Sequence, residues 1–359
     1  MEKIRVGVLF GGRSSEHEIS CISANSIINV IDRNKYEVIP IGLTKDNQWV
    51  IFEDKSPFLK LEKKDLPEVT SSGLKDNKIV KVSKFPPEEL ISLDVIFPVL
   101  HGPYGEDGTI QGLIDMHAIA FVGAGVLASA IGMDKVSTKA LLKITEFPVG
   151  DFVSILDISW KINKSKVLDQ INEMGFPVFV KPARAGSSVG ITKVKEFSKL
   201  EEAIEEARKF DKRVIVEKSI ENAREIECSV ISGEGKKAAR ASLPAEIIVK
   251  KDHEFYDFEA KYLDDSAELV VPAKLEKKLQ DQVQMLATRV FDLLNCEGLA
   301  RVDFFITKDE QVLVNEINTM PGFTSISMFP RMWEVTGLKY ADLIDYLINE
   351  ALERPLGLH

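Results

Sequence analysis

The chain carries the run Ala300-Arg-Val-Asp-Phe-Phe-Ile-Thr307 near its C-terminal end and, after a short charged turn, the run Gln311-Val-Leu-Val-Asn-Glu-Ile-Asn318. Both runs have strand composition and their connection is short, which predicts an antiparallel hairpin. With a loop of even length, Asp303 lies opposite Glu316 and Arg301 lies opposite Asn318. The other, largely apolar face is then predicted to carry Val302, Phe304, Ile306, Ile317, Asn315 and Leu313.

The even register is favoured by the cost of the alternative. An odd register would set Glu316 among Val302, Phe304 and Val314, where burying an unpaired carboxylate costs several kcal/mol. In the even register, opposed side chains begin about 4.5 to 5.5 Å apart. Two carboxylates and an amide can then share cations that take oxygen ligands at about 2.0 to 2.1 Å. This geometry suits magnesium carried with a nucleotide, although a solvated strand face explains the hairpin alone equally well.

A second stretch supports the nucleotide interpretation: Phe176-Pro-Val-Phe-Val-Lys-Pro-Ala-Arg-Ala-Gly-Ser-Ser-Val-Gly-Ile191 places a lysine at a strand end, before a Gly/Ser loop. Backbone N–H groups of such a loop can cover a triphosphate while Lys181 supplies charge. No GxxxxGK[ST] precedes a helix, so this is not a Walker loop. A plain hairpin explains such a turn more often, but a later strand over 213–218 ends in Glu217-Lys218, where a hinge would receive adenine.

Composition limits the class of protein. With 359 residues, the chain is predicted to form two or three domains. The net charge of -10, from 56 acidic and 46 basic residues spread evenly, argues against a nucleic-acid or anionic-membrane partner and favours a small molecule. The longest apolar stretch, 118–133, is interrupted by glycines and is too short to span a bilayer. No export signal or CxxC spacing is visible, which predicts a cytoplasmic protein with reduced thiols at Cys21, Cys228 and Cys296.

The order of the predicted elements divides the chain into three segments. Residues 1–125 begin with a strand, helix and strand over 4–43, typical of an α/β domain, and residues 55–87 are predicted as irregular surface or an edge hairpin. Residues 126–218 form a small α+β unit. Residues 219–359 include a helix over 277–295, whose buried face is predicted to carry Leu279, Val283, Leu286, Val290 and Leu293.

Three further features are weaker alone. Glu16 and His17 follow Gly11-Gly12, but the full dinucleotide fingerprint is missing, which disfavours a dehydrogenase. His101 most often would be a satisfied loop histidine. The aromatic-rich segment 255–262 is either a surface loop or a lid over a ligand.

Taken together, the motifs resemble the D-alanine-D-alanine ligase family of ATP-grasp enzymes along nearly the whole chain. Each motif is moderately specific, and six in the family's order are highly specific. They are Gly11-Gly-Arg-Ser-Ser-Glu-His-Glu-Ile-Ser20, His101-Gly-Pro-Tyr-Gly-Glu-Asp-Gly108, Lys181-Pro-Ala-Arg-Ala-Gly-Ser-Ser-Val-Gly190, Phe255-Tyr-Asp-Phe-Glu-Ala-Lys-Tyr262, Arg301-Val-Asp303 and Asn315-Glu-Ile-Asn-Thr-Met-Pro-Gly322.

The resemblance implies a three-domain ATP-grasp fold with a Rossmann-like N-terminal parallel sheet, and a nucleotide site. Two Mg²⁺ ions, or Mn²⁺ as a substitute, would be held by Asp303, Glu316 and Asn318. Ser219 stands where some relatives carry a large aromatic beside adenine, and Phe255 would replace it. The remaining ATP contacts implied are Lys135 and Lys181 at the phosphates, Glu217, Lys218 and Glu225 at adenine and ribose, and Lys261 on the closing lid.

The resemblance also implies a site for two amino acids. Glu16, with Ser187 and Tyr262 hydrogen-bonded to it, would bind the ammonium group of the first D-alanine in a pocket lined by His101. The oxyanion would be stabilised by Arg301 and the Gly322 N–H, and the carboxylate of the second D-alanine would be held by Ser327 and Met328, the latter replacing a commoner leucine.

The implied activity is ATP-dependent ligation of two D-alanine molecules through an acyl phosphate, for peptidoglycan synthesis by a cytoplasmic homodimer. Tyr262 favours D-alanine over D-lactate as the second substrate. A D-alanine-D-lactate or D-alanine-D-serine ligase, another ATP-grasp carboxylate-amine ligase and a nucleotide-binding module without catalysis remain as alternatives.

Overall fold

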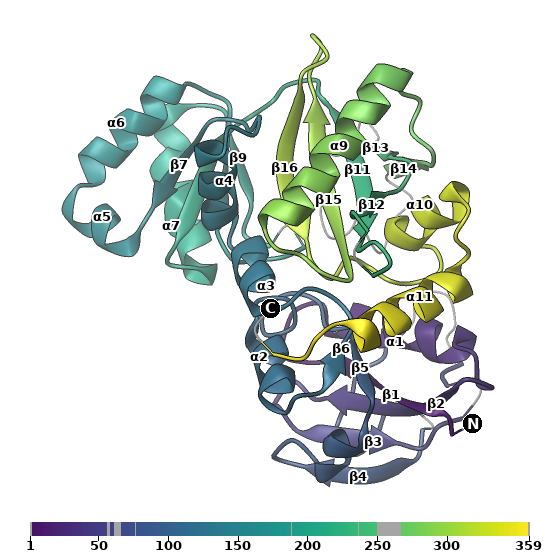
Figure 1. The fold of residues 1–359 in the computed structure, drawn as a ribbon. Coiled ribbons are helices and arrows are strands. Elements are labelled where there is room, and N and C mark those ends of the chain that lie inside the picture. Colours follow the sequence, from purple (N-terminus) through teal and green to yellow (C-terminus); the bar gives the residue numbers. More distant parts are fainter. Residues whose placement is uncertain are drawn as a thin grey trace.

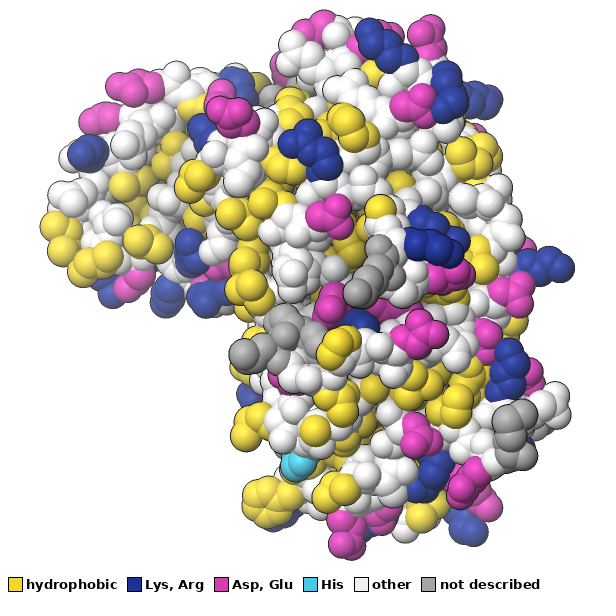
Figure 2. Space-filling model, in the orientation of Figure 1, with side chains coloured by type: hydrophobic (Ala, Val, Ile, Leu, Met, Phe, Trp, Pro, Cys, Tyr) yellow, Lys and Arg dark blue, Asp and Glu magenta, His cyan; other side chains and the backbone are white. Residues whose placement is uncertain are grey.

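The computed structural model describes residues 2–55, 58–60, 66–75, 77–187, 189–235, 237–249 and 267–357. These residues form three sheets, each with helices packed on it, arranged as three lobes (Figure 1). Within the described residues, no helix is long and apolar enough to cross a membrane. On the face drawn in Figure 2, acidic and basic side chains are interspersed, and Lys and Arg form no continuous tract among the described residues.

The N-terminal lobe begins as predicted, with a strand, a helix and a parallel strand. These are β1 (Ile4–Gly11), α1 (His17–Val30) and β2 (Tyr36–Leu43). The sheet order is β4-β3-β2-β1-β5-β6. The short connection after β2 returns the chain as an antiparallel edge, because two strands joined by a tight turn cannot run parallel. The other elements are β3 (Trp49–Phe52), β4 (Ile79–Ser83), η1 (Glu88–Ser92), β5 (Val95–Pro98), α2 (Thr109–Met116), β6 (Ala120–Phe121) and α3 (Val126–Met133).

The central lobe is a four-stranded antiparallel sheet in the order β7-β10-β8-β9. It has the mixed α+β composition predicted for this segment, with helices α4 (Lys135–Ile144) and α7 (Leu200–Phe210) and strands β8 (Val178–Pro182), β9 (Thr192–Val194) and β10 (Val214–Lys218). The Gly/Ser loop connects the paired strands β8 and β9, as the sequence predicts. The stretch before β8, for which the sequence made no prediction, forms β7 (Phe152–Ile155), α5 (Asp157–Ile162) and α6 (Lys164–Met174), and η2 (Phe197–Lys199) precedes α7.

The C-terminal lobe contains the predicted hairpin as β15 (Leu299–Ile306) and β16 (Val312–Asn318), in a sheet of order β14-β13-β11-β15-β16. Helix α9 (Lys277–Leu293) buries Leu279, Val283, Leu286 and Val290 as predicted, while Leu293 is partly buried. The remaining elements are β11 (Arg224–Ile231), β12 (Arg240–Ala241), β13 (Ala245–Val249), β14 (Ala267–Val270), α10 (Met328–Thr336) and α11 (Tyr340–Glu353).

Helix α11 returns to the N-terminal lobe, where Leu343, Leu347 and Ile348 share a core with residues of β1 and β5. Figure 1 shows this helix lying along the junction of the two lobes. The first and last parts of the chain are therefore packed together, and the predicted boundaries of 1–125, 126–218 and 219–359 stay a prediction.

Candidate active site

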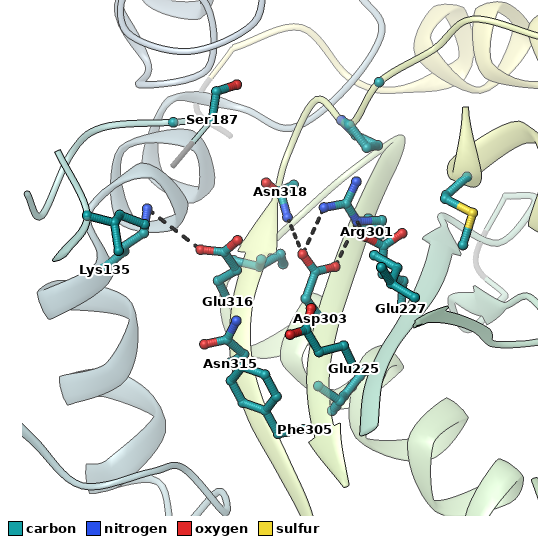
Figure 3. Close-up of a pocket in the computed structure, with 18 of the residues that line it drawn as sticks. Lys135, Ser187, Glu225, Glu227, Arg301, Asp303, Phe305, Asn315, Glu316 and Asn318 are labelled. Atoms are coloured by element: carbon teal, nitrogen blue, oxygen red, sulfur yellow. Dashed lines mark hydrogen bonds and ion pairs between the residues drawn. The ribbon is translucent and has the colours of Figure 1, made fainter. Parts of the chain in front are cut away.

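The three lobes enclose a cavity of about 720 Å³. Every predicted site residue that the structure describes lines this cavity, and Figure 3 shows part of it. Phe255, Lys261 and Tyr262, predicted on the lid, lie outside the described residues. The residues brought together are Glu16, His101, Lys135, Lys181, Ser187, Glu217, Lys218, Glu225, Arg301, Asp303, Glu316, Asn318, Gly322, Ser327 and Met328.

The hairpin has the predicted register at its polar end: Asp303 pairs with Glu316 and Arg301 with Asn318. One part of the prediction is wrong. Phe304 lies opposite Val314 and Ile306 opposite Val312, because a β-bulge follows the Asp303 pair. The extra residue in β16 changes the alternation of faces. Val314 and Ile317 are therefore both buried in the core, whereas Asn315 lines the cavity together with Glu316.

Arg301 lies between two carboxylates at the base of the cavity. Its Nε and Nη2 donate to the two oxygens of Asp303 at 2.7 and 2.8 Å, and its Nε lies 3.3 Å from Glu227 Oε1. Asn318 Nδ2 donates to Asp303 Oδ2 at 3.0 Å (Figure 3). Burial alone would lower the pKa of Arg301, but the charges of Asp303 and Glu227 raise it well above its usual range. Arg301 is thus a fixed cation presented to the cavity.

Helix α4 supplies two lysines from one face, since residues four apart project from the same side of a helix. Asp134 caps the helix by accepting from the Ser137 N–H at 2.9 Å. Lys135 Nζ donates to the Ala185 carbonyl at 3.0 Å and lies 3.6 Å from Glu316 Oε2. Lys139 turns instead towards the central sheet, so α4 links the Gly/Ser loop, the hairpin and β10.

Glu217 forms the centre of a second charged cluster. Its Oε1 lies 2.6 Å from Lys139 Nζ and its Oε2 lies 2.6 Å from Lys181 Nζ, with all three side chains largely buried. Burial would raise the pKa of Glu217, but the two ammonium groups lower it far below its usual range. For Lys181 the two effects have the opposite signs: burial would lower its pKa, but the charges of Glu217 and Glu316 raise it above its usual value. Glu217 and Lys181 are therefore both charged at neutral pH.

At another part of the cavity, the N-terminal lobe meets the Gly/Ser loop. Ser187 Oγ donates to Glu16 Oε1. Glu16 is buried, and a Cβ added at Gly102 or Gly186 would lie 2.9 or 2.7 Å from its Oε2. Only glycine leaves this carboxylate its present position, so the two loops form a close-fitting seat for a group that pairs with Glu16.

His101 connects this seat to the C-terminal lobe. Its Nδ1 lies 3.1 Å from the Met320 carbonyl and its Nε2 3.1 Å from Ser23 Oγ. Because a carbonyl only accepts, Nδ1 carries the proton and Nε2 accepts from Ser23. Burial lowers the pKa of His101, with Glu16 opposing, so the ring is neutral at pH 7. His17, in contrast, is a satisfied core histidine, accepting from the Val69 N–H at 2.9 Å.

The start of α10 forms the wall beside Arg301. Ser327 Oγ lies 2.7 Å from Thr324 Oγ1 and accepts from the Thr324 N–H at 3.1 Å. A Cβ added at Gly322 would lie 3.2 Å from Ser327 Oγ, so this loop passes close to the hydroxyl. The hydroxyl groups of Thr324 and Ser327 thus lie close to the backbone at Gly322 in the wall of the cavity.

Comparison with known proteins accounts for this arrangement. The model described as D-ala D-ala ligase N-terminus matches residues 5–124, and that described as D-ala D-ala ligase C-terminus matches residues 141–349. The chain belongs to the D-alanine-D-alanine ligase family. The D-alanine-D-alanine ligase of Pseudarthrobacter chlorophenolicus is 50% identical over 99% of this chain and 96% of its own. The D-alanine-D-alanine ligase of Streptomyces coelicolor is 47% identical over 99% of this chain and 94% of its own length.

Two solved structures show the same fold. The D-alanine-D-alanine ligase of Coxiella burnetii has a TM-score of 0.79 at 35% identity, covering 99% of this chain and 95% of its own. The VanG D-Ala:D-Ser ligase of Enterococcus faecalis has a TM-score of 0.80 at 32% identity, covering 98% of this chain and 100% of its own. The fold is therefore the ATP-grasp fold of this family, whose members use ATP and a divalent metal ion.

The donor set of the hairpin fits such a metal ion. Asp303, Glu316 and Asn318 offer two carboxylates and an amide, and hard divalent cations such as Mg²⁺ take oxygen ligands. No group of three or more His, Cys, Asp or Glu side chains suitable for a metal occurs in the described part of the chain, so the ligase metal would rest on this mixed set and on phosphate oxygens. Cys21, Cys228 and Cys296 are buried, free thiols, and none of them lines the cavity.

The residues that line the ligase cavity but were not predicted as site residues include Glu106, Lys139, Glu227 and Asn315. Lys139 could have been predicted from its position four residues after Lys135, and Glu106 lies within the motif over 101–108. Glu227 lies on β11, which the sequence did not identify, and Asn315 was assigned to the wrong face. Glu106 Oε1 accepts from the Gly102 N–H at 2.7 Å, and burial together with Glu16 raises the pKa of Glu106 to about 8.

The proposed adenine end of the cavity lacks an aromatic at position 219, since the buried Ser219 lies there. Lys218 Nζ donates to the Phe176 carbonyl at 3.1 Å. The aromatic residues Phe179 and Phe305 also line the cavity, and Figure 3 shows Phe305 beside Asn315.

Proposed function

We propose that this chain joins two D-alanine molecules to D-alanyl-D-alanine, with ATP consumed through an acyl phosphate, for peptidoglycan synthesis. The observation that carries the proposal is that one cavity holds both the Glu16 and Ser187 seat and the cluster of Arg301, Asp303 and Glu316. An ammonium-binding carboxylate and a nucleotide-metal site in one enclosure suit activation of an amino acid by ATP.

In the first step, the ammonium group of one D-alanine pairs with Glu16. A carboxylate oxygen of that D-alanine then attacks the γ-phosphorus of ATP. The bond between the γ-phosphorus and the bridging oxygen breaks, which leaves an acyl phosphate and ADP. Such transfer depends on positioning and on neutralising charge. Lys135 and Lys181 would face the phosphates, while Glu217, Lys218 and Glu225 would contact adenine and ribose, with Phe179 and Phe305 beside the base.

In the second step, the neutral amine of the other D-alanine attacks the acyl carbon and gives up one proton. The bond between the acyl carbon and the phosphate oxygen breaks, so inorganic phosphate leaves as the peptide bond forms. The negative oxygen of the tetrahedral intermediate would meet Arg301 and the Gly322 N–H, and the carboxylate of the attacking D-alanine would lie against Ser327 and Met328. Water must be excluded because it would hydrolyse the acyl phosphate. The predicted lid residues Phe255, Lys261 and Tyr262 are proposed for that task.

Asp303, Glu316 and Asn318 would hold two Mg²⁺ ions, with Mn²⁺ able to replace them. When bound, the metal ions would neutralise phosphate oxygens and polarise the γ-phosphoryl group. Arg301 would remain beside Asp303 as the protein's own cation for the oxyanion.

D-alanine is proposed as the second substrate because relatives near 50% identity over 99% of this chain are named as D-alanine-D-alanine ligases, whereas the D-Ala:D-Ser ligase is 32% identical. D-serine and D-lactate are the competing second substrates, and Tyr262 is the residue proposed to disfavour D-lactate. We also propose a homodimer in the cytoplasm, where ATP is available.

The test is a product assay with ATP, Mg²⁺ and D-alanine, with D-lactate and D-serine as competitors and L-alanine as the control. We expect D-alanyl-D-alanine, ADP and phosphate in equal amounts, with no product from L-alanine. Absence of dipeptide, or preferential formation of the D-serine or D-lactate product, would overturn the assignment.

A further inference from the structure

We propose that Lys139 is a positioning residue for the nucleotide phosphates, which acts by occupying one oxygen of Glu217 so that Lys181 keeps its positive charge available to the cavity. The inference rests on the proposed binding of ATP. It concerns a residue that belongs to none of the sequence motifs.

The geometry separates the two lysines on one carboxylate. Lys139 Nζ lies 2.6 Å from Oε1 of Glu217 and Lys181 Nζ lies 2.6 Å from Oε2, so each lysine uses its own oxygen. The side chains of Lys139 and Glu217 are only 6% and 8% exposed, so water screens their charges weakly. Lys181 and Glu217 come from the paired strands β8 and β10, whereas Lys139 reaches them from α4.

The consequence is electrostatic. A single Lys181–Glu217 pair would be neutral and would offer a phosphate little attraction. Adding Lys139 makes the cluster two ammonium groups and one carboxylate, which leaves one net positive charge beside the Gly/Ser loop. Because interactions between charges are strong where water is excluded, this single charge matters for a polyanion.

A purely structural role for Lys139 makes a different prediction. An ion pair that only fastens α4 to β10 would affect stability, and removing its partner would not repair the loss. A charge-balancing role predicts that Lys139→Met weakens phosphate binding and that adding Glu217→Gln restores it, because the double variant again carries one net positive charge.

The experiment measures the Kd values of ADP, inorganic triphosphate and adenosine, each with Mg²⁺, for the full-length protein by calorimetry. Lys139→Met should raise the Kd values of ADP and triphosphate at least about tenfold and leave the Kd of adenosine nearly unchanged. In the double variant the Kd of triphosphate should return to within about threefold of the wild-type value, because the net charge of the cluster is the same and triphosphate has no adenine or ribose for Glu217 to contact. Lys143→Met changes an exposed lysine one turn later on the same helix, so it is the matched control and should change none of the three Kd values.

Unchanged triphosphate affinity in Lys139→Met, equal losses for adenosine and ADP, or no recovery in the double variant would each overturn the proposal. If Lys139→Met does not fold, Glu217→Gln alone decides: it should bind triphosphate at least as tightly as wild type, and weaker binding would refute the charge balance. Wild-type protein that binds ADP but makes no dipeptide would refute the proposed function and leave this inference standing.

Discussion

Two buried clusters of three charges face the same cavity, and they have opposite composition. On the central lobe, the carboxylate of Glu217 lies between Lys139 and Lys181. On the C-terminal lobe, the guanidinium of Arg301 lies between Asp303 and Glu227. The first cluster has one net positive charge and the second one net negative charge, so they suit the phosphate and the metal of one metal-nucleotide complex.

The difference between the clusters teaches how one cavity can bind ions of both signs. In each cluster the central group is held by neighbours of opposite charge, which keeps it ionised although it is buried. The surplus charge then lies on the outer members, Lys181 in one cluster and Asp303 in the other. Changes in the negative cluster should therefore affect the metal and the chemical step, and changes in the positive cluster should affect nucleotide binding.

The largest effect is expected from Asp303→Asn. The variant removes a proposed metal ligand and half of the charge that balances Arg301, so kcat should fall about a thousandfold and the Mg²⁺ requirement should rise. Steady-state rates across a range of Mg²⁺ concentrations measure both. Asp309→Asn, an exposed change in the turn of the same hairpin, should retain wild-type rates. A loss confined to the KM for ATP would break the division of labour between the clusters.

A smaller effect is expected from Glu227→Gln, which keeps the shape of the side chain and removes its charge. Glu227 would touch neither substrate nor metal, and it would act by orienting Arg301 from 3.3 Å away. We expect kcat to fall about tenfold, as for weakened support of one oxyanion donor, with the KM for ATP within about twofold of wild type. If instead the KM for ATP rises and kcat holds, the two clusters are not functionally distinct.

In each cluster, the sequence predicted the central residue and one of its two neighbours, and missed the other neighbour. Lys181, Glu217, Arg301 and Asp303 lie at strand ends or on alternating faces, where local patterns carry information. Lys139 and Glu227 lie in elements whose approach to those strands depends on tertiary packing, which a local pattern does not encode.

The β-bulge shows a similar limit. The polar end of the hairpin could be predicted because an unpaired carboxylate is costly to bury. The bulge at Asn315 could not, because no glycine marks it and alternation continues on both sides. The fold class was predictable from motif order, whereas the return of α11 to the first lobe depends on long-range packing.

A change that touches neither cluster sharpens the comparison. In Gly186→Ala the new Cβ would lie 2.7 Å from Glu16 Oε2 and force that carboxylate to move. The KM for D-alanine at the first site should rise at least about tenfold, since a misplacement of about 1 Å is costly, and the KM for ATP should not change. Gly112→Ala, where the added Cβ meets only an ordinary contact at 3.7 Å, is the matched control. A raised KM for ATP would mean that the loop couples the two subsites.

The smallest expected effect concerns pH. The low pKa of Glu217 and the raised pKa values of Lys181 and Arg301 keep these cluster members charged through the neutral range, so they contribute little pH dependence there. Glu106 differs: burial, and then the charge of Glu16, raise the pKa of Glu106 to about 8, while the Gly102 and Met320 backbone and Lys135 oppose the rise.

The direction in which Glu106 changes stability with pH depends on how many protons the folded and unfolded states hold. Between its ordinary value and about 8, the folded protein holds the Glu106 proton and the unfolded chain does not, so stability falls as pH rises through this window. Glu106→Gln removes that loss, so the variant's Tm relative to wild type should be a few degrees higher at pH 8 than at pH 5. Thermal unfolding at both pH values measures the difference. His101, whose lowered pKa belongs to both proteins, cancels in the comparison to first order. A Tm difference that is the same at both pH values would show that Glu106 ionises normally in the folded protein.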